Sequence, residues 1–464
     1  MGKVDWSDTA EQAAFRRDVQ AFIAVHLPQH YRDLALQGGG LGLEQDWQTD
    51  FVLGEPPVRE AAREWLEAVA GRNWVAPHWP TSFGGAGMSP MEQFILRQEF
   101  ARAAAPPVGG QGVTMLGPTL LVHGSQEQEE RFLAPTLRGE MLWAQGFSEP
   151  GAGSDLASLQ TRAERDGDEY IINGQKMWTS TAHKSNWLFG MFRTDPGAPK
   201  HRGISFLLLR LDSPGVSVRP TISMGFQHAT NEMFYEDVHV PVDQLVGEEN
   251  RGWYVGMTLL DFERSNIAGA VDSRRHLDRL VGHVKTAEGT AHAGPRLRLW
   301  RHELAERYIE PEVLFNFSFR IVSIQSAGMV PNYEASVNKI ANSELAQKVA
   351  RTGMRVLGPY ANLWDPDEPW MPLGARYTQN YCHTVVGTIG GGANEIRRNI
   401  IATRGLGLPP RIDRHRRLTR AALGPETSRS RRRPDGGSRR DRAFANTNED
   451  VSERGAFASR PAVL

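Results

Sequence analysis

The sequence predicts an α+β fold with an N-terminal helical domain, a small central antiparallel β-barrel or sandwich, and a C-terminal helix bundle. Up to about residue 140, apolar residues recur at the three- and four-residue spacing of amphipathic helices. From about 141 to 245 they form short β-branched and aromatic runs separated by turn residues. No helical pattern interrupts these runs, which favours antiparallel strands over a parallel sheet. From about 250 to 405 the helical spacing returns.

The N-terminal domain, expected over residues 1–140, carries several helical patterns. The first two read EQAAFRRDVQAFIAVHL and PPVREAAREWLEAVAG, and the glycines at 38–40 mark a loop between them. Another helix is expected to begin at Pro90 with Ser89 as its N-cap, because a Ser side chain accepts from exposed backbone N–H groups and Pro suits the first helical position.

The middle domain is expected over residues 141–248 and the C-terminal bundle over residues 249–410. The strand patterns are DEYIINGQKMWTS, NWLFGMFRT, ISFLLLRL and GVSVRPTI. The composition then changes, because residues 411 to 442 contain twelve Arg against four acidic residues and few apolar positions. We therefore expect residues 411–464 to form a disordered tail.

The overall composition excludes several classes of protein. Over 464 residues the formal net charge is −1, which gives no general attraction for nucleic acid or anionic membranes. No apolar run approaches the ~20 residues of a membrane helix, and the N-terminus lacks an apolar signal segment. The single cysteine, Cys382, excludes an internal disulfide framework. We expect a cytoplasmic protein without a membrane span or a metal site.

The most informative segment is residues 146–180, GFSEPGAGSDLASLQTRAERDGDEYIINGQKMWTS. Its glycine-rich acidic turn (residues 149–155) offers backbone N–H groups and a hydroxyl at close range. An Asn173-Gly174 hairpin then returns the indole of Trp178 toward the same place. Together these features predict a cradle for a flat, hydrogen-bonding ring that carries a pyrophosphate, which describes a flavin.

This segment resembles the acyl-CoA dehydrogenase family, in which [Thr/Ser]-Glu-Pro-x-x-Gly-Ser-Asp is followed by Asn-Gly-x-Lys-x-Trp. The resemblance extends over roughly residues 70 to 410. It implies bound FAD and the oxidation of an acyl-CoA thioester across its α and β carbons. A carboxylate removes the α proton while a hydride leaves the β carbon for flavin N5, so the site must also stabilise an enolate-like thioester oxygen.

The carboxylate is missing from its commonest place in the family, a motif similar to Tyr-Glu-Gly-Thr-x-x-Ile, where this chain has Gly391. Either the chain is inactive or the base comes from elsewhere. A subset that includes isovaleryl-type and long-chain-type members supplies it from Leu-Asp-x-Glu-Arg, and residues 260–264 read LDFER. Helical spacing makes Glu263 the one charge on an apolar stripe, which favours a base over a structural ion pair. The other members of this stripe are Gly256, Leu259, Ile267, Ala270 and Val271.

The resemblance implies further roles. The Gly391 N–H would donate to the thioester oxygen, although the glycines at 390–392 could also be a plain connector. Arg264 would contact CoA, position Glu263, or be structural. The flavin contacts carried over are Gln145, Phe147 and Ser148 at the pyrimidine side, Gly153 and Ser154 at the pyrophosphate and thioester side, Trp178 against the ring, and Ser180 near N5.

Two departures concern the adenosine end of FAD. Residues 276–301 lack the Arg-x-x-Phe-Gly that relatives supply from a neighbouring subunit, and Pro359 interrupts the usual Leu-Gly-Gly-x-Gly turn. We expect an acyl-CoA dehydrogenase, a homo-oligomer or a hetero-oligomer with a related subunit, that passes electrons to an electron-transfer flavoprotein. The alternatives are a non-catalytic subunit that completes a partner's flavin site, and a flavin monooxygenase or oxidase of the same fold.

Overall fold

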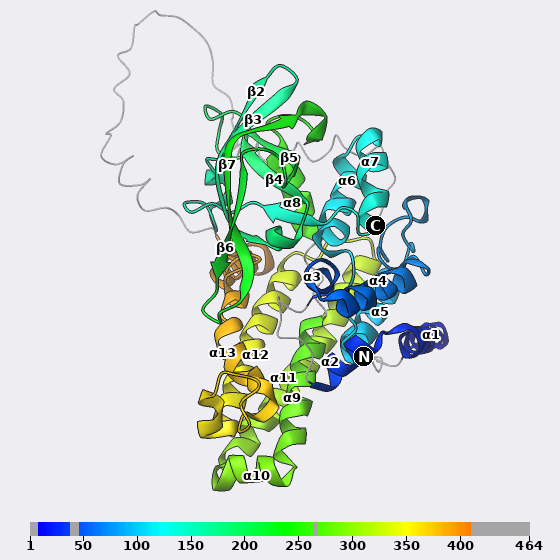
Figure 1. Cartoon of the computed structure of the whole chain (residues 1–464), viewed down its shortest axis with the longest axis vertical. Coiled ribbons are helices and arrows are strands. Elements are labelled where there is room, and N and C mark those ends of the chain that lie inside the picture. Colours follow the sequence, from blue (N-terminus) through cyan, green and yellow to red (C-terminus); the bar gives the residue numbers. More distant parts are fainter. Residues whose placement is uncertain (1–7, 38–45, 263–267, 410–464) are drawn as a thin grey trace, which may run out of the picture.

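A computed structural model describes residues 8–37, 46–262 and 268–409 of the chain (Figure 1). Helices occupy both ends and a mainly antiparallel sheet lies between them, which confirms the predicted fold class. Within those ranges, no helix combines the length and the apolar character that crossing a bilayer requires. Glu263, Arg264 and the Arg-rich tail lie outside the described residues.

The helices that precede the sheet pack around large buried aromatic side chains, among them Trp47 and Trp65. The predicted start of the helix at Pro90 is confirmed. Ser89 accepts the backbone N–H of Glu92, and the Glu92 carboxylate accepts the Ser89 N–H at 2.8 Å. These helices are α1 Ala10–His26, α2 Gln29–Gln37, α3 Trp47–Leu53, α4 Pro56–Ala70, α5 Pro90–Ala103, α6 Gly117–His123 and α7 Gln126–Leu137.

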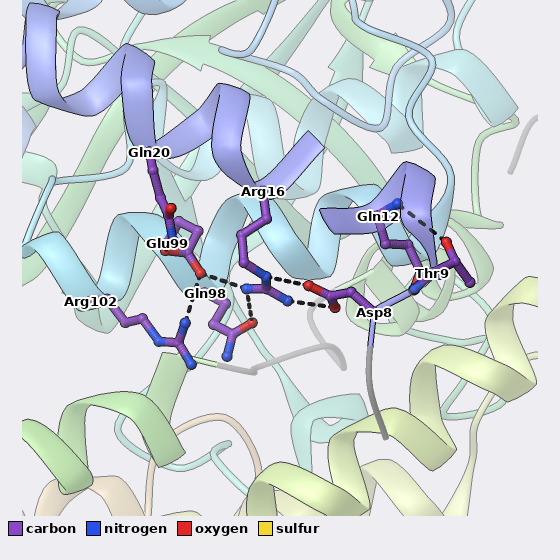
Figure 2. A network of polar contacts seen from close by, with 8 residues as sticks. All are labelled: Asp8, Thr9, Gln12, Arg16, Gln20, Gln98, Glu99 and Arg102. Carbon is purple, nitrogen blue, oxygen red and sulfur yellow. Dashed lines mark hydrogen bonds and ion pairs between the residues drawn. The ribbon is translucent and has the colours of Figure 1, made fainter. Parts of the chain in front are cut away.

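A polar network fastens α1 to α5 (Figure 2). The Arg16 guanidinium donates to Asp8 Oδ2 at 2.6 Å and to Glu99 Oε1 at 2.5 Å. Glu99 is buried and also accepts from Gln20 at 2.9 Å and from Arg102 at 2.9 Å. Because a buried carboxylate needs several donors to offset its lost hydration, Glu99 ties its neighbours into one arrangement.

The strands form a sheet of order β6-β7-β3-β2-β4-β5-β8, with β1 beside β4. β1 runs parallel to β4, a pairing that the expectation of an antiparallel domain did not include. It arises because the chain passes through the acidic turn and the β2–β3 hairpin between these two strands. The strands are β1 Trp143–Gly146, β2 Arg162–Asp166, β3 Glu169–Ser180, β4 Trp187–Arg193, β5 Ile204–Arg210, β6 Val216–Ile222, β7 His228–Pro241 and β8 Leu245–Val246.

The C-terminal helices form an elongated bundle below the sheet (Figure 1), with α9, α11 and α12 sharing one apolar core. The tip of the β6–β7 hairpin reaches this bundle, because the Phe226 ring meets Trp364 edge to face at 5.4 Å. The helices are α8 Gly252–Phe262, α9 Ala268–Val284, α10 Ala287–Ala293, α11 Leu297–Ser326, α12 Tyr333–Leu357, α13 Arg376–His383 and α14 Asn394–Ile400.

Candidate functional site

The acidic turn is closed by its own backbone. Glu149 and Ala152 exchange two backbone hydrogen bonds of 3.0 Å each, which folds the chain back on itself. A Cβ added at Gly151 or Gly153 would meet nothing within 4 Å, and Gly153 and Ser154 are exposed. The backbone of this turn is therefore open to a ligand, as a pyrophosphate would require.

Trp178 occupies a bulge in β3 next to that turn. The β3–β7 register is interrupted between Lys176 and Thr179, and Trp178 takes a left-handed conformation with φ of 60°. Its indole is 57 % exposed. A bulky residue at positive φ is strained, and such strain concentrates at ligand sites. Met177 N–H donates to Ser148 O at 2.8 Å, so the bulge and the acidic turn lie side by side.

The remaining flavin-side residues on β1 and β3 differ in accessibility. Gln145 and Ser180 are half-buried. Phe147 is buried, and its ring packs edge to face on Phe189 at 6.1 Å and Phe206 at 6.2 Å. Any contact of Phe147 with a flavin would thus come from its backbone, and the side chain belongs to the core.

An ion pair lies beneath the turn and the bulge. Lys176 Nζ is 2.7 Å from Glu149 Oε1 and 3.2 Å from the Phe147 carbonyl oxygen. Burial lowers the pKa of Lys176 to about 8, partly offset by the Glu149 carboxylate. Burial alone would raise the pKa of Glu149, but Lys176 and the donors Thr161 and Gln160 outweigh it and hold that pKa below its usual value. Both groups remain charged at neutral pH.

The glycine triplet at 390–392 precedes α14 and is exposed. Gly391 and Gly392 have φ of 61° and 81°, which favours glycine over other residues. The Gly391 carbonyl accepts from the Arg397 guanidinium at 2.6 Å, and the Gly392 carbonyl accepts from Lys339 Nζ at 2.8 Å. Because a charged side chain binds each of these carbonyls, the backbone of the glycine triplet is held in one conformation.

The predicted base follows directly after α8, whose described part ends at Phe262. The helix packs on the sheet, because a Cβ at Gly256 would meet Met191 Sδ at 2.6 Å, and Leu259 is fully buried. Ala270 and Val271, which belong to the same predicted apolar stripe, are buried at the start of α9. The helix leading into Glu263 is therefore anchored to the sheet.

At the predicted adenosine end, other residues of the chain cover the Gly358–Asn362 turn only in part, because Pro359 and Asn362 are exposed. A Cβ at Gly358 would meet Arg296 Nη2 at 2.7 Å, and the Tyr360 ring packs on His292 at 4.0 Å. The open glycines of the acidic turn and the exposed Trp178 thus leave room for the pyrophosphate and the ring of FAD, whereas the Arg296 side chain would have to move for a ligand to approach Gly358.

Four residues next to the bulge were not predicted from the sequence to act in the site, namely Glu149, Lys176, His183 and Asn231. The sequence does contain a signal that Lys176 is buried. Residues two apart on a strand share a face, so Lys176 lies on the inward face together with the buried Ile172 and Tyr170. A lysine in that position demands a buried partner. The contacts of His183 and Asn231 join segments that are far apart in the sequence, so no local pattern of residues predicts them.

Comparisons with known proteins agree with this geometry. Residues 55–140, 144–238 and 250–406 match the N-terminal, middle and C-terminal domains of acyl-CoA dehydrogenases. The chain is 36% identical over 401 residues to acyl-CoA dehydrogenase IpdE1 of Mycobacterium tuberculosis, covering 85% of this chain and 97% of that protein. It is 39% identical over 339 residues to acyl-CoA dehydrogenase FadE29 of the same organism, covering 71% and 84% respectively.

Solved structures give the same result. The "Tcur3481-Tcur3483 steroid ACAD" matches with a TM-score of 0.74 at 31% identity, covering 88% of this chain and 100% of that chain. The ChsE4-ChsE5 complex from Mycobacterium tuberculosis matches with a TM-score of 0.71 at 34% identity, again covering 88% and 100%.

Proposed function

Because this chain belongs to the acyl-CoA dehydrogenase family, we propose that it oxidises an acyl-CoA thioester to the α,β-unsaturated thioester. Members of the family are FAD-dependent flavoproteins, and the chain is an oxidoreductase that acts on acyl-CoA. The observation that carries the proposal is Trp178, an exposed indole on a strained residue beside the open acidic turn.

The flavin ring would lie against the bulge. Trp178 would pack on it, Ser180 would lie near its N5 side, and Gln145 and Ser148 would bind its pyrimidine edge with the backbone of Phe147. Gly153 and Ser154 would bind the pyrophosphate, and Ser154 would also border the thioester. When bound, FAD supplies the acceptor for the hydride that leaves the β carbon.

The proton chemistry falls to the chain itself. Glu263 takes the α proton onto its carboxylate, since a carboxylate in a desolvated pocket is a stronger base. The Gly391 N–H donates to the thioester oxygen while negative charge develops there. With the proton on Glu263 and the hydride removed, the electron pair of the α C–H bond forms the double bond. Arg264 binds CoA or orients Glu263.

We further propose that a related subunit completes the adenosine end. The Arg296 side chain against Gly358, Pro359 in the turn and the absence of Arg-x-x-Phe-Gly from residues 276–301 support this. Two of the similar structures are named as pairs of proteins, ChsE4 with ChsE5 and Tcur3481 with Tcur3483. The same observations favour the second candidate, a non-catalytic subunit of such a pair. An electron-transfer flavoprotein is the proposed electron acceptor.

The test is to purify the chain alone and with a related subunit, and to measure flavin per chain and turnover with an artificial electron acceptor. The acyl-CoA panel should include straight, branched and ring-bearing groups, since one similar structure is named a steroid ACAD. We expect bound flavin and turnover with at least one thioester. Flavin that binds without any turnover would favour the non-catalytic subunit, and no flavin in either preparation would contradict both.

A further inference from the structure

Among the described residues around the candidate site, Glu149 and Lys176 form the most deeply buried ion pair. The Lys176 side chain is 0 % exposed and Glu149 is 7 % exposed. The Nζ–Oε1 distance of 2.7 Å is that of a charge-assisted hydrogen bond. Lys176 has no surface for a ligand, whereas Glu149 borders a cavity with Gly151 and Gln160 but has both carboxylate oxygens engaged by protein donors.

The pair joins three segments that are separate in the sequence. Glu149 Oε2 accepts the backbone N–H of Gln160 at 2.6 Å, and Oε1 accepts that of Thr161 at 3.0 Å, just before β2. Lys176 on β3 donates to Glu149 and to the Phe147 carbonyl at the end of β1. Each contact is a hydrogen bond from a charged side chain to a backbone group or to the opposite charge. Because such bonds are directional, they fix the relative position of the three segments.

The same contacts set the position of the Trp178 bulge relative to the acidic turn, and these are the two segments predicted to bind the flavin. Lys176 holds residues 147 and 149, and the next residue, Met177, holds the Ser148 carbonyl at 2.8 Å. Trp178 follows immediately, in the left-handed conformation. Ser148 therefore lies between the two residues that Lys176 holds, and Trp178 lies one residue beyond Met177.

Stability alone does not account for the pair. Removing two charges from water costs free energy that their attraction repays only in part, and apolar side chains of similar size often stabilise such a position equally well. A buried pair does, however, fix geometry, because each charged group has defined partners and directions.

We propose that Glu149 and Lys176 are positioning residues, which hold Ser148 and Trp178 at the separation that the flavin ring of the proposed function requires. The inference rests on that function. It assigns to the pair an effect on cofactor binding that is separate from its effect on folding.

The test compares Glu149→Gln, Lys176→Met and the double variant with wild type. FAD release from the purified holoprotein is followed by flavin fluorescence, the environment of the ring by visible circular dichroism, and folding by thermal unfolding. We expect each single variant to bind FAD about tenfold more weakly or worse, in line with the loss of one charged hydrogen-bond partner. The double variant should regain thermal stability without regaining FAD affinity or the wild-type dichroism.

The matched control is the exposed ion pair between Arg138 and Glu140, in which Nε and Oε1 are 2.6 Å apart. The double variant Arg138→Met with Glu140→Gln should leave the FAD affinity and the dichroism unchanged. If the buried double variant does not fold, Lys176→Arg replaces it. That variant keeps the charge but changes its reach, so we expect a folded protein with weaker FAD binding.

Wild-type affinity and dichroism in the folded double variant, or in Lys176→Arg when it is used, would overturn the inference and leave the proposed function intact. A wild-type protein that binds no FAD, alone or with a related subunit, would overturn the proposed function and the inference with it.

Discussion

The imidazole rings of His183 and His228 stack with their centroids 3.8 Å apart, and Asn231 hydrogen-bonds to both. The orientation of the Asn231 amide follows from Thr179, whose carbonyl oxygen can only accept and lies 3.0 Å from Nδ2. Nδ2 therefore also donates to His183 Nδ1 at 3.1 Å, which requires a neutral His183. Burial, with the charge of His228 next, lowers the pKa of His183 to about 4.

This arrangement predicts a pH-dependent stability. The folded-state pKa of His183 lies below its unfolded value of about 6.5, so its contribution is complete above about pH 6.5 and is lost as the pH falls toward 4. His183→Gln should flatten the decrease of Tm between pH 7 and 4.5. Thermal unfolding across this range is the measurement. The exposed His302 gives the control His302→Gln, and an equal slope in wild type and His183→Gln would contradict the role of the pair.

Glu263→Gln should retain bound FAD and lose most dehydrogenation. The amide keeps the shape of the side chain and removes the base, for which we expect a loss of about 10²- to 10⁴-fold in kcat. Steady-state turnover and the flavin absorption spectrum are the measurements. Glu395→Gln is the matched control, since Glu395 is exposed on α14 with Arg398 at 3.8 Å. If Glu263→Gln turned over at the wild-type rate and Glu395→Gln did not, the base would have to be reassigned.

Replacing Trp178 should separate folding from cofactor binding. Trp178→Gly removes an exposed side chain and relieves a positive φ, so we expect the free energy of unfolding of the flavin-free protein to stay within about 1 kcal/mol of wild type. FAD affinity should fall, since the ring loses its packing surface. Trp370→Gly, at another exposed tryptophan, should change neither quantity. Unchanged FAD affinity in Trp178→Gly would show that the indole does not contact the ring.

Arg16→Met should destabilise the N-terminal helices, because it leaves the buried Glu99 carboxylate with fewer donors (Figure 2). Loss of one charged partner of a buried group predicts about 1–3 kcal/mol, measured by denaturant unfolding. Arg63→Met is the control, since Arg63 forms an exposed pair with Glu60 at 3.9 Å and should change stability by less than about 0.5 kcal/mol. Similar losses in the two variants would contradict a special role for the α1–α5 network.

Much of the fold could be read from local patterns. Ser89 and Pro90 mark the start of α5, since capping depends on neighbouring residues alone. The helix and strand regions follow from the spacing of apolar residues for the same reason. The parallel pairing of β1 with β4 has no local signature, because it depends on the path of the intervening chain.

The candidate site, like the fold, could be predicted from the sequence only in part. The acidic turn and Trp178 stand out as a motif, and the structure brings them together through Met177 and Ser148. The left-handed backbone of Trp178 could not be predicted, because strain of this kind is imposed by surrounding contacts. Nor could the burial of Phe147, whose aromatic partners come from β4 and β5.

The contact between Phe226 and Trp364 has a mechanical consequence. The chain leaves the sheet for the bundle at α8, and the β6–β7 hairpin meets the bundle again at a second, separate point. Any movement that separates the hairpin tip from the bundle would have to break this edge-to-face contact, which contributes about 0.5–1.5 kcal/mol.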